Sequence, residues 1–263
     1  PRGAGGAGSV KSSAARWKQI AAALRSTPLH PQWLCRDPRM QLPEARNLPQ
    51  AGYLLDIGAG DGWLRHRLPS GWCYVAFDHP EVGRSWYGAR PDVCGDAVSL
   101  PFGDASFDAV ALLEVVEHLE RFDVALSEVN RVLKPGGVVL CSMPFLYPVH
   151  DAPRDFQRLT IHGLQYAASR FGWKTQSSRR VSPGFHCLAV QFGVGLSSII
   201  IAPPGRGVIR RLVSFALLPL IPIVNVVCAL LSALLPAPDG LAGGHVMVFS
   251  KADRCFAAPT DGP

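Results

Sequence analysis

Acidic residues and glycines follow one another in a short segment that could bind a ligand. Asp56 stands near the end of an apolar run, and glycines follow at positions 58, 60 and 62. Glycine adopts positive φ without a Cβ clash and lets a backbone approach a ligand closely. A dinucleotide fingerprint, Gly-x-Gly-x-x-Gly, would need a glycine where this chain has Trp63. A carboxylate here would also repel a pyrophosphate, so the segment predicts a ligand with a positive centre and no phosphates.

A second carboxylate, Asp78, closes another apolar run over residues 72–77. At the tip of the second strand of a βαβ unit, a carboxylate is placed to accept both ribose hydroxyls. We therefore predict a strand before each acid, with a helix starting after the glycine turn. Apolar runs over residues 107–113 and 138–144 predict two further strands. We predict a helix between them over residues 123–133.

In order and spacing, these segments resemble the class I S-adenosylmethionine-dependent methyltransferases, in particular the small-molecule, type 11-like group that includes quinone-biosynthesis enzymes. The likeness covers residues 50 to about 180. It implies an α/β fold, with a doubly wound Rossmann-like seven-stranded sheet and an antiparallel last strand. It also implies S-adenosylmethionine as cofactor, bound by Asp56, Gly58, Gly60, Asp78, Asp96, Ala97 and Glu114.

The resemblance assigns a part of the cofactor to each acid. Asp56 would face the ammonium, Asp78 would hold the ribose hydroxyls from a solvent-facing strand tip, and Asp96 with the Ala97 backbone would meet the adenine. The alternative for Asp96 is a turn residue.

Two histidines are candidate catalytic bases. Methyl transfer from a sulfonium has a neutral leaving group, so alignment supplies much of the acceleration, and a base is needed only for an acceptor that carries a proton. His118 ends the order Glu-x-x-Glu-His, similar to a metal site in certain quinone O-methyltransferases. We favour Glu117 and His118 as residues that hold a strand-to-helix corner, and predict no metal.

His150 opens a segment whose pattern resembles one common in methyltransferases of bacterial glycan and envelope gene neighbourhoods. It follows the fifth strand, which places it beside the acceptor in that fold. Asp155 and Arg158, in the same segment, are expected to form a structural pair. We expect a helix after Thr160, which can cap its N-terminus.

Four parts are predicted along the chain. Residues 1–50 form a basic extension and candidate lid, with a helix over residues 12–24. Residues 51–181 form the cofactor-binding core. Residues 182–241 form an apolar membrane-associating insertion, and residues 242–263 form the last strand and tail. Between residues 156 and 238 there are eight Lys or Arg residues and no Asp or Glu.

The apolar insertion is long enough for membrane helices, since about 20 apolar residues span a bilayer. Two crossings would place Arg206, Arg210 and Arg211 on the far side, against the positive-inside tendency. We therefore predict a hairpin lying in the membrane plane without spanning. The alternatives are a homodimer seam or an enlarged core.

The distribution of charge and the cysteines limit the possible partners and the cellular compartment of the protein. The net charge of +6 resides in residues 1–50. This basic arm could bind anionic lipid or nucleic acid, and the alternative is a solvated segment without a partner. Seven scattered cysteines without Cys-x-x-Cys argue against a disulfide framework and a zinc site, and favour a reducing cytoplasm. No secretory signal is visible, so we expect a location at the inner membrane face.

The predicted function is methyl transfer to an amphipathic or lipid-linked small-molecule or glycan acceptor, with a membrane surface as partner and no nucleic acid. The alternatives are a non-catalytic cofactor-binding subunit of a membrane complex, or a methyltransferase for a soluble substrate.

Overall fold

The chain forms two compact units. The computed structural model describes residues 23–35, 42–82, 90–201, 208–237 and 240–253. Unit 1 comprises residues 1–35, 146–148 and 182–243, and unit 2 comprises residues 36–145, 149–181 and 244–263. The helix expected over 12–24 lies outside the described residues, except for the helical Ala23 and Leu24.

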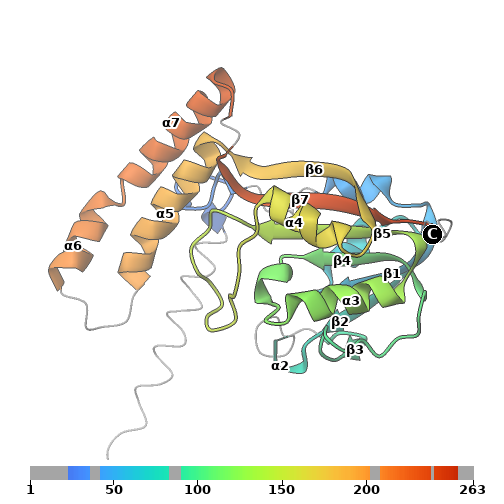
Figure 1. Cartoon of the computed structure of the whole chain (residues 1–263). Coiled ribbons are helices and arrows are strands. Elements are labelled where there is room, and N and C mark those ends of the chain that lie inside the picture. The colour runs from blue at the N-terminus through green and yellow to red at the C-terminus, as the bar shows by residue number, and fades with distance from the viewer. Residues whose placement is uncertain (1–22, 36–41, 83–89, 202–207, 238–239, 254–263) are drawn as a thin grey trace, which may run out of the picture. The chain divides into compact units, whose positions relative to one another are not determined.

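A seven-stranded sheet in the order β3-β2-β1-β4-β5-β7-β6 organises unit 2 (Figure 1). The strands are β1 (Ala51–Ile57), β2 (Gly71–Asp78), β3 (Val93–Cys94), β4 (Phe107–Leu113), β5 (Leu133–Pro144), β6 (Trp173–Pro183) and β7 (Ala242–Lys251). Strands β1 to β5 pair in parallel, whereas β7 runs antiparallel to β5. The predicted α/β class, with its antiparallel last strand, is confirmed.

Short and long helices join these strands. In unit 2 they are η1 (Pro43–Asn47), η2 (Trp63–Arg67), α2 (Pro80–Val82), η4 (Val116–His118), α3 (Phe122–Val132) and α4 (Ile161–Ser169). Thr160 caps α4 as expected, since its Oγ1 accepts from the Gly163 N–H at 3.0 Å. The helix predicted after the glycine turn is only the 3-10 turn η2. Pro69 follows it and disfavours helical backbone at Leu68, which is extended.

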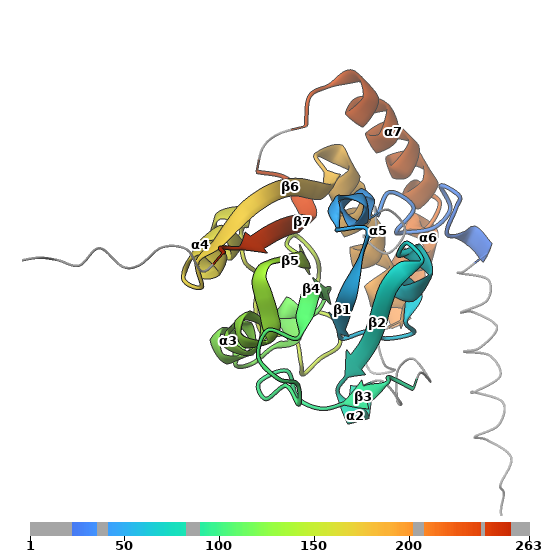
Figure 2. The same ribbon diagram turned by 90° about the vertical axis from the view of Figure 1, so that its right-hand side faces the viewer.

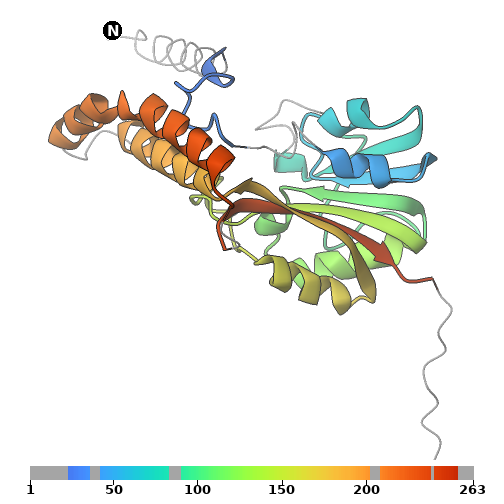
Figure 3. The same cartoon turned by 90° about the horizontal axis from the view of Figure 1, so that it is seen from above.

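Side chains alternate between the two faces of the sheet, as strand geometry requires. Helices α3 and α4 cover one face (Figure 3), where they pack on Leu55, Ile57, Val110, Leu112, Val139, Cys141, Met247 and Phe249. On the other face, η1 and η2 pack on Leu54, Ala109, Ala111, Leu113, Leu140 and Val248. With both faces covered, the ends of the strands remain as the place for a ligand.

Among the described residues of unit 1 there are three apolar helices: α5 (Phe185–Ile201), α6 (Val208–Leu217) and α7 (Leu220–Leu234). Helix α5 contacts both others (Figure 2). The buried Asn225 of α7 donates its side-chain N–H groups to the carbonyls of Pro28 at 2.7 Å and His30 at 3.0 Å. The stretch Phe215–Leu234 has a mean hydropathy of 2.4, and is long and apolar enough to cross a membrane. It contains the break between α6 and α7.

Candidate active site

The carboxyl ends of four parallel strands meet at one edge of the sheet. Strand β1 pairs with β2 on one side and with β4 on the other, so the strand order reverses between β1 and β4. Open α/β sheets bind ligands at the carboxyl edge beside such a switch point. The residues that follow β1, β2, β4 and β5 therefore define the candidate site.

The glycine turn after β1 is folded tightly against β2. Gly58 and Gly60 have φ values of 71° and 56°, in the left-handed region that favours glycine. The Gly58 N–H donates to the Phe77 carbonyl at 2.9 Å. A Cβ on Gly58 would lie 2.4 Å from the Val115 side chain, so no larger residue fits there.

Asp56 is buried one residue before the end of β1. Its Oδ2 accepts a hydrogen bond from the Tyr74 hydroxyl at 2.5 Å. Burial and the neighbouring Asp56 carboxylate raise the pKa of Tyr74 well above its ordinary value. The phenol therefore remains a hydrogen-bond donor that orients the carboxylate.

Asp78, the last residue of β2, is 5% exposed, so the expectation of a solvent-facing tip is wrong. Its Oδ2 accepts from the Gly60 N–H at 3.0 Å, and its Oδ1 from the His79 N–H at 2.7 Å. These bonds draw the side chain under the glycine turn. A carboxylate offers about four lone-pair positions, so Asp78 retains capacity for two hydroxyl donors.

Asp96 and Ala97 lie in a turn after β3. Asp96 is exposed, and its Oδ1 accepts from the Val98 N–H at 3.1 Å, while Ala97 is buried. The local hydrogen bond supports the turn interpretation and leaves the second carboxylate oxygen available.

An ion pair on α3 holds the loop that follows this turn. Glu128 Oε2 accepts from the Leu100 N–H at 2.9 Å, and Arg131 donates to the carbonyls of Leu100 and Phe102. Arg131 also donates to both oxygens of Glu128, at 2.8 and 2.7 Å. These bonds lower the pKa of Glu128.

Glu114, directly after β4, is a non-glycine residue at φ 58°. Its N–H lies 3.0 Å from Ser142 Oγ, and its Oε1 accepts from the same hydroxyl at 2.8 Å. Such a conformation is costly and persists where surrounding bonds impose it. Ser142, buried in β5, supplies those bonds.

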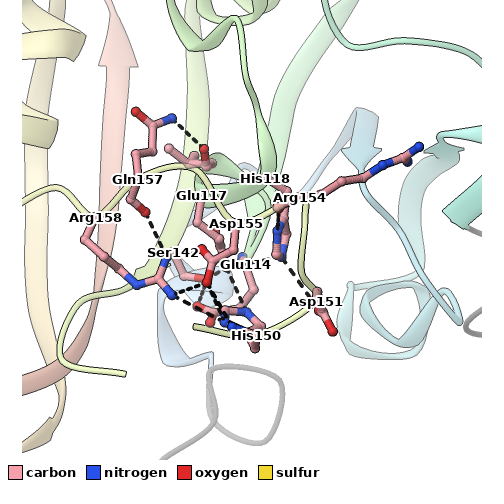
Figure 4. Close-up of polar contacts among 11 residues, drawn as sticks. Glu114, Glu117, His118, Ser142, His150, Asp151, Arg154, Asp155, Gln157 and Arg158 are labelled. Carbon is pink, nitrogen blue, oxygen red and sulfur yellow. Dashed lines mark hydrogen bonds and ion pairs between the residues drawn. The ribbon is translucent and has the colours of Figure 1, made fainter. Parts of the chain in front are cut away.

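His118 and His150, 32 positions apart in the chain, lie together in the structure (Figure 4). Their ring centroids are 5.2 Å apart. The segment after β5 folds back onto η4, because the Phe156 N–H donates to the Glu117 carbonyl at 2.9 Å and the Gln157 side chain donates to the Val116 carbonyl at 2.8 Å.

Charged partners surround the two histidines. Asp155 and Arg158 form the predicted pair, with Arg158 Nη2 2.7 Å from Asp155 Oδ2. The Arg158 hydrogen bonds lower the pKa of Asp155 to about 2. Burial lowers the pKa of His150, which favours its neutral form. Glu117 is fully buried, and this burial, followed by the nearby Glu114, raises its pKa.

Comparison with known proteins agrees with this geometry. Residues 55–141 match the family model of a methyltransferase domain. Residues 55–141 therefore form a methyltransferase domain, similar to those of the class I S-adenosylmethionine-dependent enzymes. Over 94 residues, it is 37% identical to the demethylmenaquinone methyltransferase of Staphylococcus haemolyticus, covering 33% of this chain and 39% of that protein. Over 124 residues, it is 33% identical to the ubiquinone/menaquinone biosynthesis C-methyltransferase UbiE of Rubrivivax gelatinosus, covering 45% and 47%. The matches thus span less than half the length of these relatives.

Solved structures share the fold of this methyltransferase domain at low sequence identity. A chain of the complex between the Trm112 methyltransferase activator of Haloferax volcanii and a methyltransferase superposes with a TM-score of 0.51, at 16% identity, covering 92% of this chain and 97% of that one. A protein described as a sarcosine dimethylglycine methyltransferase from Galdieria sulphuraria gives 0.50, at 17% identity, with 85% of each chain covered.

The donor set suits the methyltransferase cofactor, S-adenosylmethionine. Buried Asp56 and Asp78 bring negative charge and hydrogen-bond acceptors to the edge of the sheet. These groups match an ammonium, a sulfonium and ribose hydroxyls, and they would repel phosphates.

Two further residues of the methyltransferase site were not predicted from the sequence, Tyr74 and Ser142. Each is a hydroxyl inside an apolar strand, and this polar interruption was the available signal. Tyr74 bonds the carboxylate of Asp56, and Ser142 bonds the carboxylate of Glu114. These partners depend on how neighbouring strands pair in the sheet, and the sequence alone does not determine that pairing.

Proposed function

We propose that the protein transfers the methyl group of S-adenosylmethionine to an amphipathic or lipid-linked acceptor at a membrane surface. The observation that carries the acceptor class is the apolar stretch Phe215–Leu234, whose most apolar window is only 17% buried. Monomeric soluble proteins rarely expose large contiguous apolar patches, and such patches mark protein or membrane contacts.

In this proposal the carboxyl edge of the sheet binds the cofactor. Asp56, Gly58 and Gly60 take the methionine part, Asp78 the ribose hydroxyls, and Asp96 with the Ala97 backbone the adenine. Glu114 lies beside them at the end of β4. The hydrogen bonds of Asp78 and Glu114 support these roles, because they fix both carboxylates before any ligand arrives.

His150 is the proposed base, with His118 as the second candidate. S-adenosylmethionine supplies an activated methyl group, so the protein must mainly align the acceptor and exclude water. An acceptor hydroxyl or amine also has a proton to lose. Neutral His150 can accept that proton, and Asp155 beside it can stabilise the resulting imidazolium, with His150 Nδ1 3.3 Å from Asp155 Oδ2.

Quinones with isoprenoid tails lead the candidate acceptors, because the relatives above carry quinone methyltransferase names. Polyprenyl-linked glycans and lipid head groups are the other classes. All three combine a polar group with a long apolar tail, and such substrates reside in membranes. We propose a location at the cytoplasmic face of the inner membrane, with the basic residues 206, 210 and 211 near anionic head groups.

Methyl-labelled S-adenosylmethionine tests the proposal directly. The full-length protein is incubated with the label and either a total lipid extract, a demethylated quinone or an aqueous metabolite extract. We expect label in the organic phase. Label confined to the aqueous phase would favour a soluble acceptor, and sedimentation would then test whether the apolar helices form a homodimer seam.

A further inference from the structure

We propose that Tyr74 and Arg65 are positioning residues that direct the Asp56 carboxylate at the ammonium group of the cofactor. In the proposed function, on which this inference rests, Asp56 takes the methionine part of the cofactor. Neither Tyr74 nor Arg65 needs to touch the ligand. Together they set how strongly the site prefers a ligand with an amino-acid part over one without it.

Strand pairing brings Tyr74 and Asp56 to one face of the sheet. Asp56 of β1 lies opposite Ala76 of β2, and Tyr74 stands two residues before Ala76. Side chains two residues apart along a strand share a face, so the Tyr74 ring lies on the same face as Asp56. Its hydroxyl donates to Asp56 Oδ2 at 2.5 Å. The last glycine of the turn lies beside this contact, because a Cβ on Gly62 would be 4.0 Å from the Tyr74 hydroxyl.

The Asp56 carboxylate is directed by the protein rather than by water, since Asp56 is only 3% exposed. A buried carboxylate is costly unless hydrogen bonds or opposite charges surround it. The Tyr74 phenol supplies a hydrogen bond but no positive charge. An ammonium brought by a ligand therefore gains more from Asp56 than a neutral group does. That gain requires a fixed carboxylate, because a preorganised group does not have to reorient when the charge arrives.

Arg65 of η2 lies over the Tyr74 ring. The centre of its guanidinium is 4.9 Å from the ring centroid, within the range of a cation–π contact. Arg65 Nη2 also lies 2.7 Å from Asp92 Oδ2, and the same oxygen accepts from the Ala76 N–H at 2.8 Å. Asp92 thus ties the guanidinium to the backbone of β2, two residues after Tyr74. The cation polarises the phenol and strengthens its donation to Asp56.

The two buried carboxylates of the site differ in how they are held. Backbone N–H groups of Gly60 and His79 bind Asp78, whereas a side-chain hydroxyl binds Asp56. Removing that hydroxyl alone therefore changes the end of the site that takes the amino-acid part and leaves the bonds of Asp78 in place. This difference allows the positioning role to be separated from the integrity of the turn.

Two ligands that share their adenosine part test the inference on the full-length protein. S-adenosylhomocysteine, the product of methyl transfer, carries the amino-acid part, and methylthioadenosine does not. Calorimetry measures both affinities for each variant. Tyr74→Phe should weaken S-adenosylhomocysteine binding roughly 10-fold, as for one hydrogen bond to a charged group, and should change methylthioadenosine binding by less than about twofold. A general disturbance of the turn would weaken both.

Arg65→Gln should weaken S-adenosylhomocysteine binding alone, by about 2–5-fold, the scale of a cation–π contact at an exposed site. In the Tyr74→Phe background the same change should have no further effect. Two residues that act through one interaction are not additive, and this double-mutant cycle measures that coupling.

Tyr53→Phe and Arg67→Gln are the matched controls, because both residues are exposed, Tyr53 in β1 and Arg67 in η2. They should bind the two ligands as the wild type does, and circular dichroism verifies that each variant folds. The inference is overturned by an equal loss for both ligands in Tyr74→Phe, by no loss for either, or by an undiminished effect of Arg65→Gln in the Tyr74→Phe background. A wild type that binds neither ligand contradicts the proposed function itself, and the inference with it.

Discussion

The Ser142 hydroxyl holds Glu114 by two hydrogen bonds at once. It accepts from the Glu114 N–H at 3.0 Å and donates to Glu114 Oε1 at 2.8 Å. Through this pair, β5 sets the backbone turn and the carboxylate direction at the end of β4. Glu114 therefore keeps its left-handed conformation before a ligand binds.

Ser142→Ala should lower the free energy of unfolding by about 1–3 kcal/mol, because the half-buried Glu114 carboxylate loses a hydrogen bond. It should also weaken cofactor binding. Denaturant titration and calorimetry measure both effects. Ser169→Ala is the control, since the Ser169 hydroxyl is exposed and bonds only locally. If both variants stay within about 0.5 kcal/mol of wild type, as surface changes do, the pair has no structural importance.

Asp78→Ala should weaken S-adenosylmethionine binding by about 1.5–3 kcal/mol, the scale for hydrogen bonds to a charged group. Asp78→Asn retains an oxygen for the Gly60 N–H and separates the loss of charge from disturbance of the turn. Calorimetric titration measures the affinities. Asp123→Ala, an exposed acid paired with Arg170, should bind normally. Unchanged affinity in Asp78→Ala would rule out the ribose role.

His150→Ala should reduce turnover by about 10²–10⁴-fold if His150 is the general base. Cofactor affinity should be nearly unchanged. Single-turnover rates report the chemical step separately from product release. His162→Ala is the comparison, as an exposed histidine of the same unit. A loss smaller than about threefold would mean that alignment alone drives the reaction.

Glu128→Gln should alter stability in acid. The pKa of Glu128 is lowered from 4.5 by its hydrogen bonds to Arg131. A lowered folded-state pKa stabilises the fold above the unfolded-state pKa, and the stabilisation is lost as pH falls through the folded-state value. The wild type should thus lose stability below pH 4.5 more steeply than the variant, which should be about 1–3 kcal/mol less stable at pH 7. Parallel curves for the two proteins would contradict this.

Binding to liposomes should rise with the fraction of anionic lipid. Changing Arg206, Arg210 and Arg211 together to Gln should weaken it, by about 1 kcal/mol for each residue near the surface. A variant with Arg67, Arg170 and Lys174 of unit 2 changed to Gln loses the same three charges and controls for net charge. Co-sedimentation measures the binding, and equal losses in the two variants would argue against a specific role of the arginine cluster.

A cysteine placed at Gly207 tests whether the apolar helices cross the membrane. We expect no additional reaction with an impermeant thiol reagent outside intact cells, relative to the parent protein. Labelling from outside would show that the hairpin crosses the membrane and would contradict the in-plane arrangement.

Strands β1 and β2 and the glycine turn between them were predictable because their signals are local. Apolar runs that end in Asp56 and Asp78, with glycines between them, encode strands and a tight turn within a few residues. Strand order followed from resemblance to a family rather than from any local pattern. The helix after the turn was wrongly predicted, because Pro69 limits it to one 3-10 turn.

Contacts between distant segments were decided only by the tertiary structure. The sequence marks Glu117, His118 and His150 as polar residues near strand ends, but their convergence depends on hydrogen bonds of Phe156 and Gln157 to η4. The sequence likewise cannot show that Ser142 meets Glu114, since register across β4 and β5 sets that pairing. Local patterns determine which residues reach the carboxyl edge, whereas the packing of one segment on another determines which of them touch.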